Sequence, residues 1–251
     1  MVYAGTGESA PSTTGTGTQI NDSTAFNSNR DDNTYVGYMY GATGSDKYDV
    51  THTNNNPSTI KGVIDSWYNT TTNLSELSTK LSHTAGFCGD RLSSTSSSAA
   101  PAQIGGYGTQ VTYYGAYYRN YTNKTPSFKC TYKGNDLYTT PEDASQGNRK
   151  LSVPIGLITA DEVAFAGGVY NTNNKQFYLY TNKYYWTMSP DRFSNDNASV
   201  FLVYNDGYLG YSYVYSALGV RPVINLKADV TFAAVDGSTL GTSSNPYVVM
   251  N

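Results

Sequence analysis

The strongest structural pattern of this chain lies at residues 184–226, YYWTMSPDRFSNDNASVFLVYNDGYLGYSYVYSALGVRPVINL. The apolar run at 200–204 ends at the turn Asn205-Asp206-Gly207, which predicts a hairpin. The preceding run at 184–188 ends at Ser189-Pro190. Runs rich in aromatic and β-branched residues and bounded by turn residues are typical of short strands, and here they lie at 184–188, 200–204 and 219–226. The stretch therefore predicts antiparallel strands joined by tight turns.

A helix with a clear start precedes this stretch. Thr159 is followed three residues later by Glu162, the spacing of a capping box, and Gly167-Gly168 ends the helical pattern. A short apolar run at 153–158 predicts a strand before the helix, and the run at 177–180 predicts another after it. Short strands and a helix alternate here, so this part of the chain predicts one mixed α+β unit.

The first half of the chain carries one strong helical pattern among polar stretches. Apolar residues recur at helical spacing over 60–68, behind the start signal Pro57-Ser58-Thr59, and leucines at 74–81 predict a second short helix. The run at 35–40 predicts a strand, and 93–150 is rich in turn residues. The predicted organisation is a flexible arm at 1–34, a loop-rich elaboration of the same domain at 35–150, a core at 151–230 and an edge segment at 231–251.

Composition limits the classes of function. Only 14% of the residues are charged, against roughly 25% in an ordinary soluble domain. The net charge is −3 and no basic block occurs, so the electrostatic signature of a nucleic-acid-binding protein is missing. No apolar run is long enough to span a bilayer. Such uncharged polar surfaces are common on exported bacterial proteins, so we expect an extracellular or cell-surface location, with an export, membrane or pilus anchor removed ahead of Met1.

The two cysteines, Cys88 and Cys130, point to the same compartment. An even count in a chain of exported composition predicts one disulfide. In the chain-entropy model, closing a loop of about forty residues stabilises the fold by about 3–4 kcal/mol. Two unrelated buried thiols are the alternative. Because His52 and His83 are isolated in the sequence, no metal site and no cofactor are predicted.

Three pieces of sequence, at 156–162 (GLITADE), 185–190 (YWTMSP) and 219–226 (GVRPVINL), occur in this order. Together they resemble the C-terminal half of the C-type-lectin-fold variable proteins that bacterial diversity-generating retroelements diversify, in pilin-like or otherwise exported gut bacterial proteins. The resemblance implies an α+β fold related to the formylglycine-generating enzymes, with short antiparallel strands, two to three helices and long loops. It also implies a variable region at 186–226 that carries a ligand surface.

The residues between the last two pieces support this interpretation independently. Residues 191–218 contain no Lys, Glu, Gln, Met or Trp, the amino acids that a pyrimidine-ending Asn codon cannot become when its two adenines are randomised. Chance absence from a short window is the alternative. Tyrosine, serine and asparagine are also the residues that antibody loops use for contact. The alternation Tyr211, Tyr213, Tyr215 predicts three rings on one face of a strand, either displayed or packed against the core.

The predicted ligand contacts are the polar and tyrosine residues of this segment together with one leucine. Phe193, Val200, Phe201 and Val203 are expected to point inward, because their apolar bulk suits a core. The predicted contacts are Asp191, Arg192, Ser194, Asn195, Asn197, Ser199, Leu202, Tyr204, Tyr208, Tyr211, Tyr213 and Tyr215.

The function expected is binding, not catalysis. The oxidase chemistry of the formylglycine-generating enzymes needs thiols in the C-terminal half, where this chain has none. The Glu-Pro-Asn, Gln-Pro-Asp and Trp-Asn-Asp signatures of calcium-dependent lectins are also missing. We therefore expect a displayed adhesin or receptor for an unknown macromolecule, a protein or glycan on another cell or phage, and no nucleic acid. The alternatives are a structural pilin-like subunit and a hydrolase of unknown type.

Overall fold

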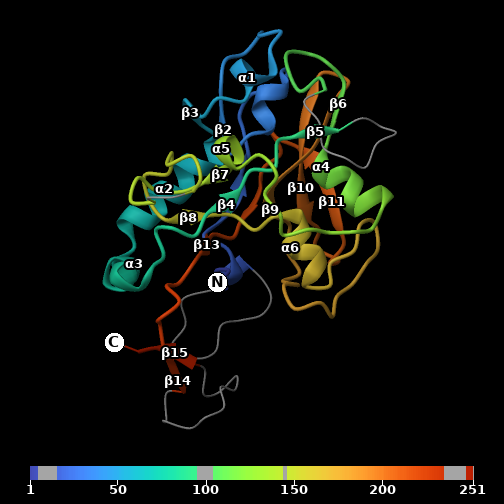
Figure 1. Cartoon of the computed structure of the whole chain (residues 1–251). Coiled ribbons are helices and arrows are strands. Elements are labelled where there is room, and N and C mark those ends of the chain that lie inside the picture. The colour runs from blue at the N-terminus through green and yellow to red at the C-terminus, as the bar shows by residue number, and fades with distance from the viewer. Residues whose placement is uncertain (5–15, 95–103, 144–145, 235–246, 251) are drawn as a thin grey trace.

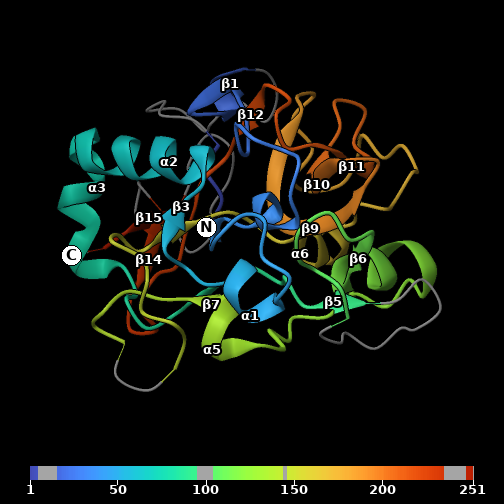
Figure 2. The ribbon, with the colours of Figure 1, turned by 90° about the horizontal axis from the view of Figure 1, so that it is seen from above.

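The computed structural model describes residues 1–4, 16–94, 104–143, 146–234 and 247–250 (Figures 1 and 2). Within these ranges the largest sheet has seven strands. Its main path runs β1 (Asn21–Thr24), β12 (Leu218–Val220), β9 (Tyr185–Ser194), β10 (Asn197–Val203) and β11 (Leu209–Tyr213). β6 (Thr112–Tyr114) pairs with the C-terminal end of β9, and β5 (Ser93–Ser94) pairs with β6.

The predicted hairpin is confirmed. β10 and β11 are antiparallel, and the turn between them contains Gly207 at φ +88°. β9 is longer than expected, because the strand continues through Ser189-Pro190 and turns only at Asn195 and Asp196, both with positive φ. The pairing of β9 with β10 is irregular beside Pro190. A bulge there accommodates a residue that has no N–H to donate.

Both faces of β10 are buried. Leu202 enters the larger apolar cluster, which contains Trp186 and residues of α2. Phe201 points to the opposite face and packs in a second cluster with Val163 of α6. Successive side chains of a strand point to opposite faces, so this strand connects two separate cores. The sheet is therefore the centre of the molecule, and the hairpin cannot vary freely along its length.

The three predicted helices are confirmed. α2 (Thr59–Thr70) begins after Ser58, whose side chain accepts a hydrogen bond from the Lys61 N–H. α3 (Thr72–Leu77) and the 3-10 turn η3 (Ser78–Lys80) form the second helical segment. α6 (Ala160–Phe165) has the full capping box, since Thr159 and Glu162 each bond the other's backbone N–H. No helix within the described ranges is both long and apolar enough to cross a membrane.

The arm predicted at 1–34 is wrong for its described part. β1 pairs with β12, and the N-terminal amine donates to the Ile224 carbonyl at 2.6 Å. Phe26 and Asn33 are fully buried. Asn33 is buried because its side-chain amide donates to three carbonyls of the 107–110 segment. The polar composition of this segment therefore gives no sign of β1, which is a strand of the large sheet.

Two strand predictions also need correction. At 35–40 the chain forms the 3-10 turn η2 (Asn33–Val36) and then only a two-residue strand, β2 (Met39–Tyr40), paired with β3 (Asn56–Pro57). The run at 177–180 is not a strand: Phe177 and Leu179 are buried, but the backbone turns there. In both runs most of the apolar side chains are buried, although little or none of the backbone is in a strand.

The remaining elements are short. The strand predicted at 153–158 is reduced to β8 (Ile155–Gly156), and the one at 219–226 is split between β12 and β13 (Val223–Ile224). The tail prediction is described only for β15 (Tyr247–Val249), which pairs with β14 (Phe232–Ala234); 241–246 lie outside the described residues. The other elements are η1 (Thr16–Thr18), α1 (Tyr48–Thr51), β4 (Phe87–Cys88), α4 (Gly115–Tyr117), η4 (Tyr118–Thr122), α5 (Lys133–Asp136) and β7 (Leu137–Tyr138).

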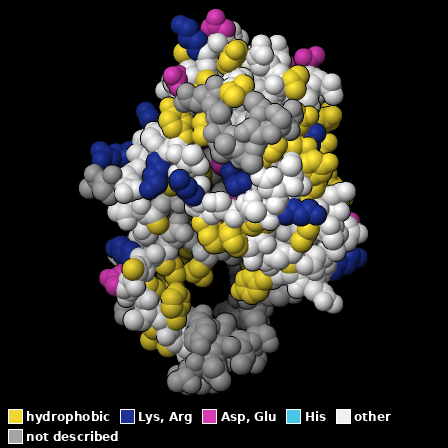
Figure 3. All heavy atoms as spheres, turned by 45° about the vertical axis from the view of Figure 1, so that its right-hand side comes forward, with side chains coloured by type: hydrophobic (Ala, Val, Ile, Leu, Met, Phe, Trp, Pro, Cys, Tyr) yellow, Lys and Arg dark blue, Asp and Glu magenta, His cyan; other side chains and the backbone are white. Residues whose placement is uncertain are grey.

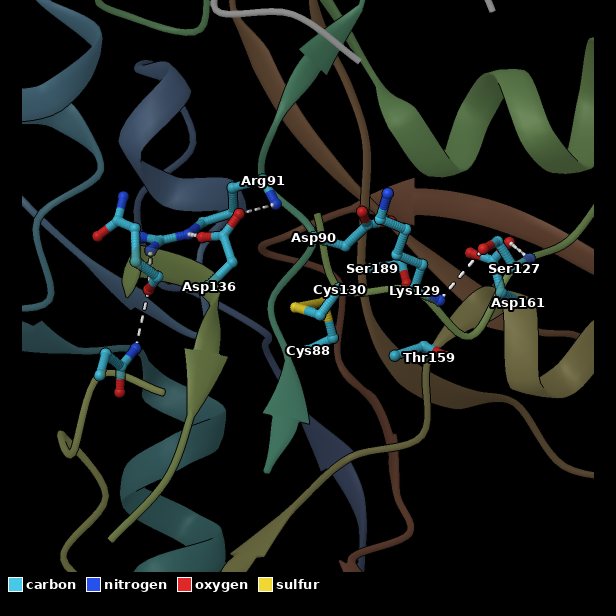
Figure 4. The surroundings of a disulfide bond; sticks show 12 residues. Cys88, Asp90, Arg91, Ser127, Lys129, Cys130, Asp136, Thr159, Asp161 and Ser189 are labelled. Carbon is cyan, nitrogen blue, oxygen red and sulfur yellow. Dashed lines mark hydrogen bonds and ion pairs between the residues drawn. A yellow bond between two sulfur atoms is a disulfide. The ribbon is translucent and has the colours of Figure 1, made fainter. Parts of the chain in front are cut away.

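The predicted disulfide between Cys88 and Cys130 is confirmed, with the two Cα atoms 5.6 Å apart. It joins β4 to the loop before α5 (Figure 4). Close by, the buried Arg91 guanidinium bonds Asp136, with Nε 2.8 Å from Oδ1. The loop-rich segment is thus tied to itself covalently and by a buried ion pair. The fold class is α+β, with a multistranded sheet, few helices and long loops.

Candidate ligand-binding surface

The strand register decides which predicted residues share a face. Ser199 lies opposite both Arg192 on β9 and Tyr213 on β11, and Phe201 lies opposite Tyr211. Directly paired residues point to the same side of a sheet. Arg192, Tyr211 and Tyr213 therefore belong to one face. This face covers the second core, because Phe201 of the same set is buried in it.

A groove of about 390 Å³ lies on the hairpin. It contains four of the predicted tyrosines and no charged residue. Gly210 allows their rings to pack closely, because a Cβ at this position would come within 2.7 Å of ring carbons of Tyr204 and Tyr208. The groove residues are Tyr170, Asn171, Tyr204, Tyr208, Gly210, Tyr211, Ser212 and Tyr213.

The tyrosines hold one another in place. The rings of Tyr204 and Tyr208 stack with their centroids 3.9 Å apart, and the Tyr204 hydroxyl donates to the Tyr211 carbonyl at 2.8 Å. Tyr213 stacks with Tyr215 just beyond the end of β11, and both side chains are about two-fifths exposed, at 39% and 41%. The predicted common face of Tyr211, Tyr213 and Tyr215 thus extends past the strand. On the other face Val214 is buried.

Sequence reasoning missed Tyr170. It lies in an irregular segment with no periodic pattern, and it reaches the groove through a bridge to Leu209. Its ring contacts Tyr121, with centroids 5.0 Å apart, and it covers Phe201. Only the tertiary contact with β11 could have identified it. Within the segment 113–118, the rings of Tyr113 and Tyr117 lie against Arg192, whereas Tyr114 and Tyr118 are buried.

Arg192 lies between these two groups of rings. Its guanidinium carbon is 4.2 Å from the ring centroid of Tyr211, 4.9 Å from that of Tyr117 and 5.4 Å from that of Tyr113. Its Nε donates to Asp191 Oδ2 at 2.6 Å. Burial raises the pKa of Asp191 to about 6, and Arg192 opposes that rise. The pair therefore lies beneath the rings, with the carboxylate shielded from solvent.

Three predicted ligand contacts are wrong, because their side chains are buried. Asp191 and Ser199 are covered by the Arg192 and tyrosine layer, at 0% and 1% exposed. Leu202, at 1%, points into the opposite core beside Trp186. Its neighbours on both sides face the second core, so alternation excludes Leu202 from the groove face. None of the three can reach a ligand in this arrangement.

The inward anchors were predicted correctly. Phe193, Val200, Phe201 and Val203 are all fully buried or nearly so, two in each core. The first pair faces the larger core, and the second pair faces the core beneath the groove. Burial of this much apolar surface is the main stabilising contribution of the hairpin.

The remaining predicted contacts lie away from the groove. Ser194, Asn195 and Asn197 surround the turn between β9 and β10, where the Asn197 side chain donates to the Asn195 carbonyl. Asn195 is exposed, and the other two are half-buried. Figure 3 brings forward the right-hand side of Figure 1, where β6, β10 and β11 lie. It shows yellow side chains, a class that includes tyrosine, among white ones, with several Lys and Arg side chains and few acidic ones. The predicted surface thus consists of a tyrosine groove and a separate polar turn.

The two histidines lie in separate parts of the fold. Burial lowers the pKa of His52 well below its usual value, and His83 lies 3.5 Å from the exposed Glu142. Across the described ranges no group of three or more His, Cys, Asp or Glu side chains is arranged to hold a metal ion.

A polar cavity of about 130 Å³ lies beside the disulfide, where Figure 4 shows Asp90 and Asp161. Both carboxylates bond the single guanidinium of Arg119, with Asp161 Oδ2 at 2.7 Å. Burial raises the pKa of Asp90 to about 6, against the opposing effect of Arg119. Burial disfavours the charged form of Asp90, and the Arg119 cation, which Asp161 shares, offsets this only in part.

Asp90→Asn tests this charge balance. The folded pKa of Asp90 lies above its unfolded value of about 3.9, so its stabilising contribution is complete below that value and is lost as pH rises through about 6. Relative to the variant, the unmodified protein should lose about 1 kcal/mol of unfolding free energy between pH 5 and pH 7.5. Asn also suits the φ of +49° at this position. Urea unfolding across this pH range measures the difference, with the exposed Asp46→Asn as control. A difference that does not change with pH would contradict the raised pKa.

Comparisons with known proteins found no relative of this chain. No protein-family model, no curated protein and no solved structure matches the chain.

Proposed function

We propose that this protein is an extracellular ligand-binding protein of the adhesin or receptor type, which presents a diversified tyrosine-, asparagine- and serine-rich surface on a C-type-lectin-like scaffold. The observation that carries the proposal is the uncharged groove of about 390 Å³ formed by four tyrosines of the 204–213 hairpin and Tyr170. Its volume lies within the usual range for ligand sites, about 300–1,000 Å³.

The contrast between buried and exposed side chains in the hairpin supports this proposal. Phe201 and Val203 are buried in the second core. Tyr213, which lines the groove, and Tyr215, which stacks on it, are exposed. A surface whose side chains contribute little to the core can change its sequence without loss of the fold. Tyrosine adds a large, rigid contact area with a polar hydroxyl, which suits recognition of varied partners.

A structural pilin-like subunit is the second candidate. Its support is an aromatic pair outside the hairpin: Phe128 and Phe165 stack at 4.0 Å although they are 71% and 51% exposed. Exposed aromatic patches of this kind suit contacts between subunits. Sedimentation of the unmodified protein and of Phe165→Ser separates the two candidates. Self-association that the variant abolishes favours the subunit, and a monomer at high concentration favours the receptor.

The proposal predicts that the exposed hairpin positions tolerate replacement. A surface-display library randomised at the exposed Tyr213 and Tyr215 and the half-buried Asn197 and Tyr208 should remain mostly folded. It should yield binders to an immobilised model protein such as hen egg-white lysozyme. A matched library at Phe193, Val200, Phe201 and Val203 should be mostly unfolded, because these positions are buried. If the first library unfolds as the second does, the groove is structural and the proposal is wrong.

Diversification has its own test in the gene. A near-copy of the segment encoding 186–226, rich in Asn codons and close to a reverse transcriptase gene, is expected at the locus. Sequencing of independent isolates should find substitutions concentrated at exposed hairpin positions. A locus without a near-copy, with substitutions spread evenly along the chain, would exclude diversification while leaving the binding test above unaffected.

A further inference from the structure

Asp191 and Arg192 occupy an irregular point of β9. Arg192 pairs with Ser199 of β10, and the next pairing joins Pro190 to Val200, so Asp191 has no residue opposite it. Such a bulge re-aims side chains. The Asp191 carboxylate consequently meets the Arg192 guanidinium on the same side of the sheet, with Oδ2 at 2.6 Å from Nε.

The arginine joins two distant parts of the chain. Tyr113 and Tyr117 come from β6 and α4, whereas Tyr211 comes from β11, and all three rings lie around the same guanidinium. The Arg192 side chain is only 17% exposed. A planar guanidinium stacks on aromatic faces in a way that an ammonium does not. Arg192 is thus arranged to fix ring positions more than to contact a ligand.

The carboxylate is a costly residue at this position. It is fully buried, it has one oxygen bonded to Arg192, and its other oxygen has no hydrogen-bond partner among the described residues. Buried ion pairs are often no more stabilising than apolar residues of similar size. The presence of the Asp191–Arg192 ion pair is therefore better explained by its effect on ring positions than by a gain in stability.

We infer that Asp191 and Arg192 are positioning residues that hold Tyr117 of the 113–117 segment and Tyr211 of the hairpin in one preorganised surface. This inference rests on the proposed function, and it sets a boundary within the predicted variable region: the pair remains Asp-Arg when the surface is selected for binding, while Tyr213 and Tyr215 vary. Preorganisation lowers the entropic cost of binding, so the effect of the pair is on affinity.

Ring order measured by NMR tests the positioning directly. In Arg192→Lys, the sheet amide signals should be retained, while Tyr117 and Tyr211 should lose their distinct ring signals and take averaged, mobile ones. Arg30→Lys is the matched control, because Arg30 is exposed and lies over the ring of Tyr215 at 4.4 Å. It should leave the Tyr117 and Tyr211 rings unchanged. Unchanged rings in Arg192→Lys would overturn the inference.

The unmodified protein provides a measurement that does not depend on a variant folding. The Nε–H of Arg192 should be as rigid as the backbone in ¹⁵N relaxation, whereas that of Arg30 should be mobile. An Arg192 side chain as mobile as Arg30 would also overturn the inference.

Selection separates positioning from a purely structural role. A library randomised at 191, 192, 213 and 215 is sorted once for folded display and once for binding to immobilised lysozyme. Several pairs at 191–192 should survive the folding sort, and Asp-Arg should be enriched at least ~10-fold in the binding sort, equivalent to about 1.4 kcal/mol. Binders with unrelated pairs would contradict the inference. A library with no binders counts against the proposed function alone, since the NMR result stands independently.

Discussion

Phe201→Ala should lower the unfolding free energy by about 3–5 kcal/mol, because it removes a large side chain from a packed core. Phe201 is fully buried and packs with Val203 and Leu209 beneath the tyrosine groove. The surrounding strands are held by their ladders and cannot collapse into the cavity. Urea unfolding of the unmodified protein and the variant measures the loss.

Tyr215→Asn is the matched control in the same hairpin. Its ring is exposed, so the change should cost no more than about 0.5 kcal/mol. Tyr211→Ser, which the sequence alone predicts to be nearly neutral, should fall between the two, because its ring is half-buried and lies against Arg192 at 4.2 Å. If Tyr215→Asn destabilises as much as Phe201→Ala, the exposed rings belong to the core.

Arg91→Ala should cost a comparable amount, about 3–5 kcal/mol, through charge rather than volume. The Arg91 side chain is fully buried, and it donates to Asp136 and to the Met39 carbonyl at 2.8 and 2.7 Å. It also donates to Asn54 at 2.9 Å. The variant leaves the Asp136 carboxylate buried without its cation, which is the costly part of the change.

The double variant Arg91→Met, Asp136→Asn distinguishes charge from packing. It removes both ions and keeps most of the volume, so it should be clearly more stable than Arg91→Ala. Arg30→Ala, at an exposed arginine, should change stability by no more than about 0.5 kcal/mol. A loss below about 1 kcal/mol for Arg91→Ala would mean that water reaches the Asp136 site.

The candidate surface could be predicted in part. The groove tyrosines at 204, 208, 211 and 213 and the inward Phe193 and Phe201 follow from the contrast between amphipathic and purely apolar side chains. Leu202 could not be assigned, because the rule of one buried face fails for a strand that has a core on each side. The prediction for Asp191 fails because a charged residue is normally exposed, whereas the Asp191 carboxylate is buried and bonded to the half-buried Arg192.

The local features of this protein can be assigned from residue type and spacing alone. The capping box at Thr159, the hairpin turn at Gly207, the helix over 60–68 and the choice of the two cysteines all depend on residue types and spacing within short segments. Backbone preferences and helix caps act over a few residues, so they can be identified without the fold.

Contacts between distant segments, by contrast, can be identified only from the folded chain. The pairing of β1 with β12, the place of Tyr170 in the groove, the rings around Arg192 and the burial of Arg91 all join residues far apart in the chain. Polar segments such as 16–34 give no periodic signal of their burial, because hydrogen bonds to distant carbonyls stabilise them there. The function-bearing surface depends on these long-range contacts, since its rings come from three separate segments that only the folded sheet brings together.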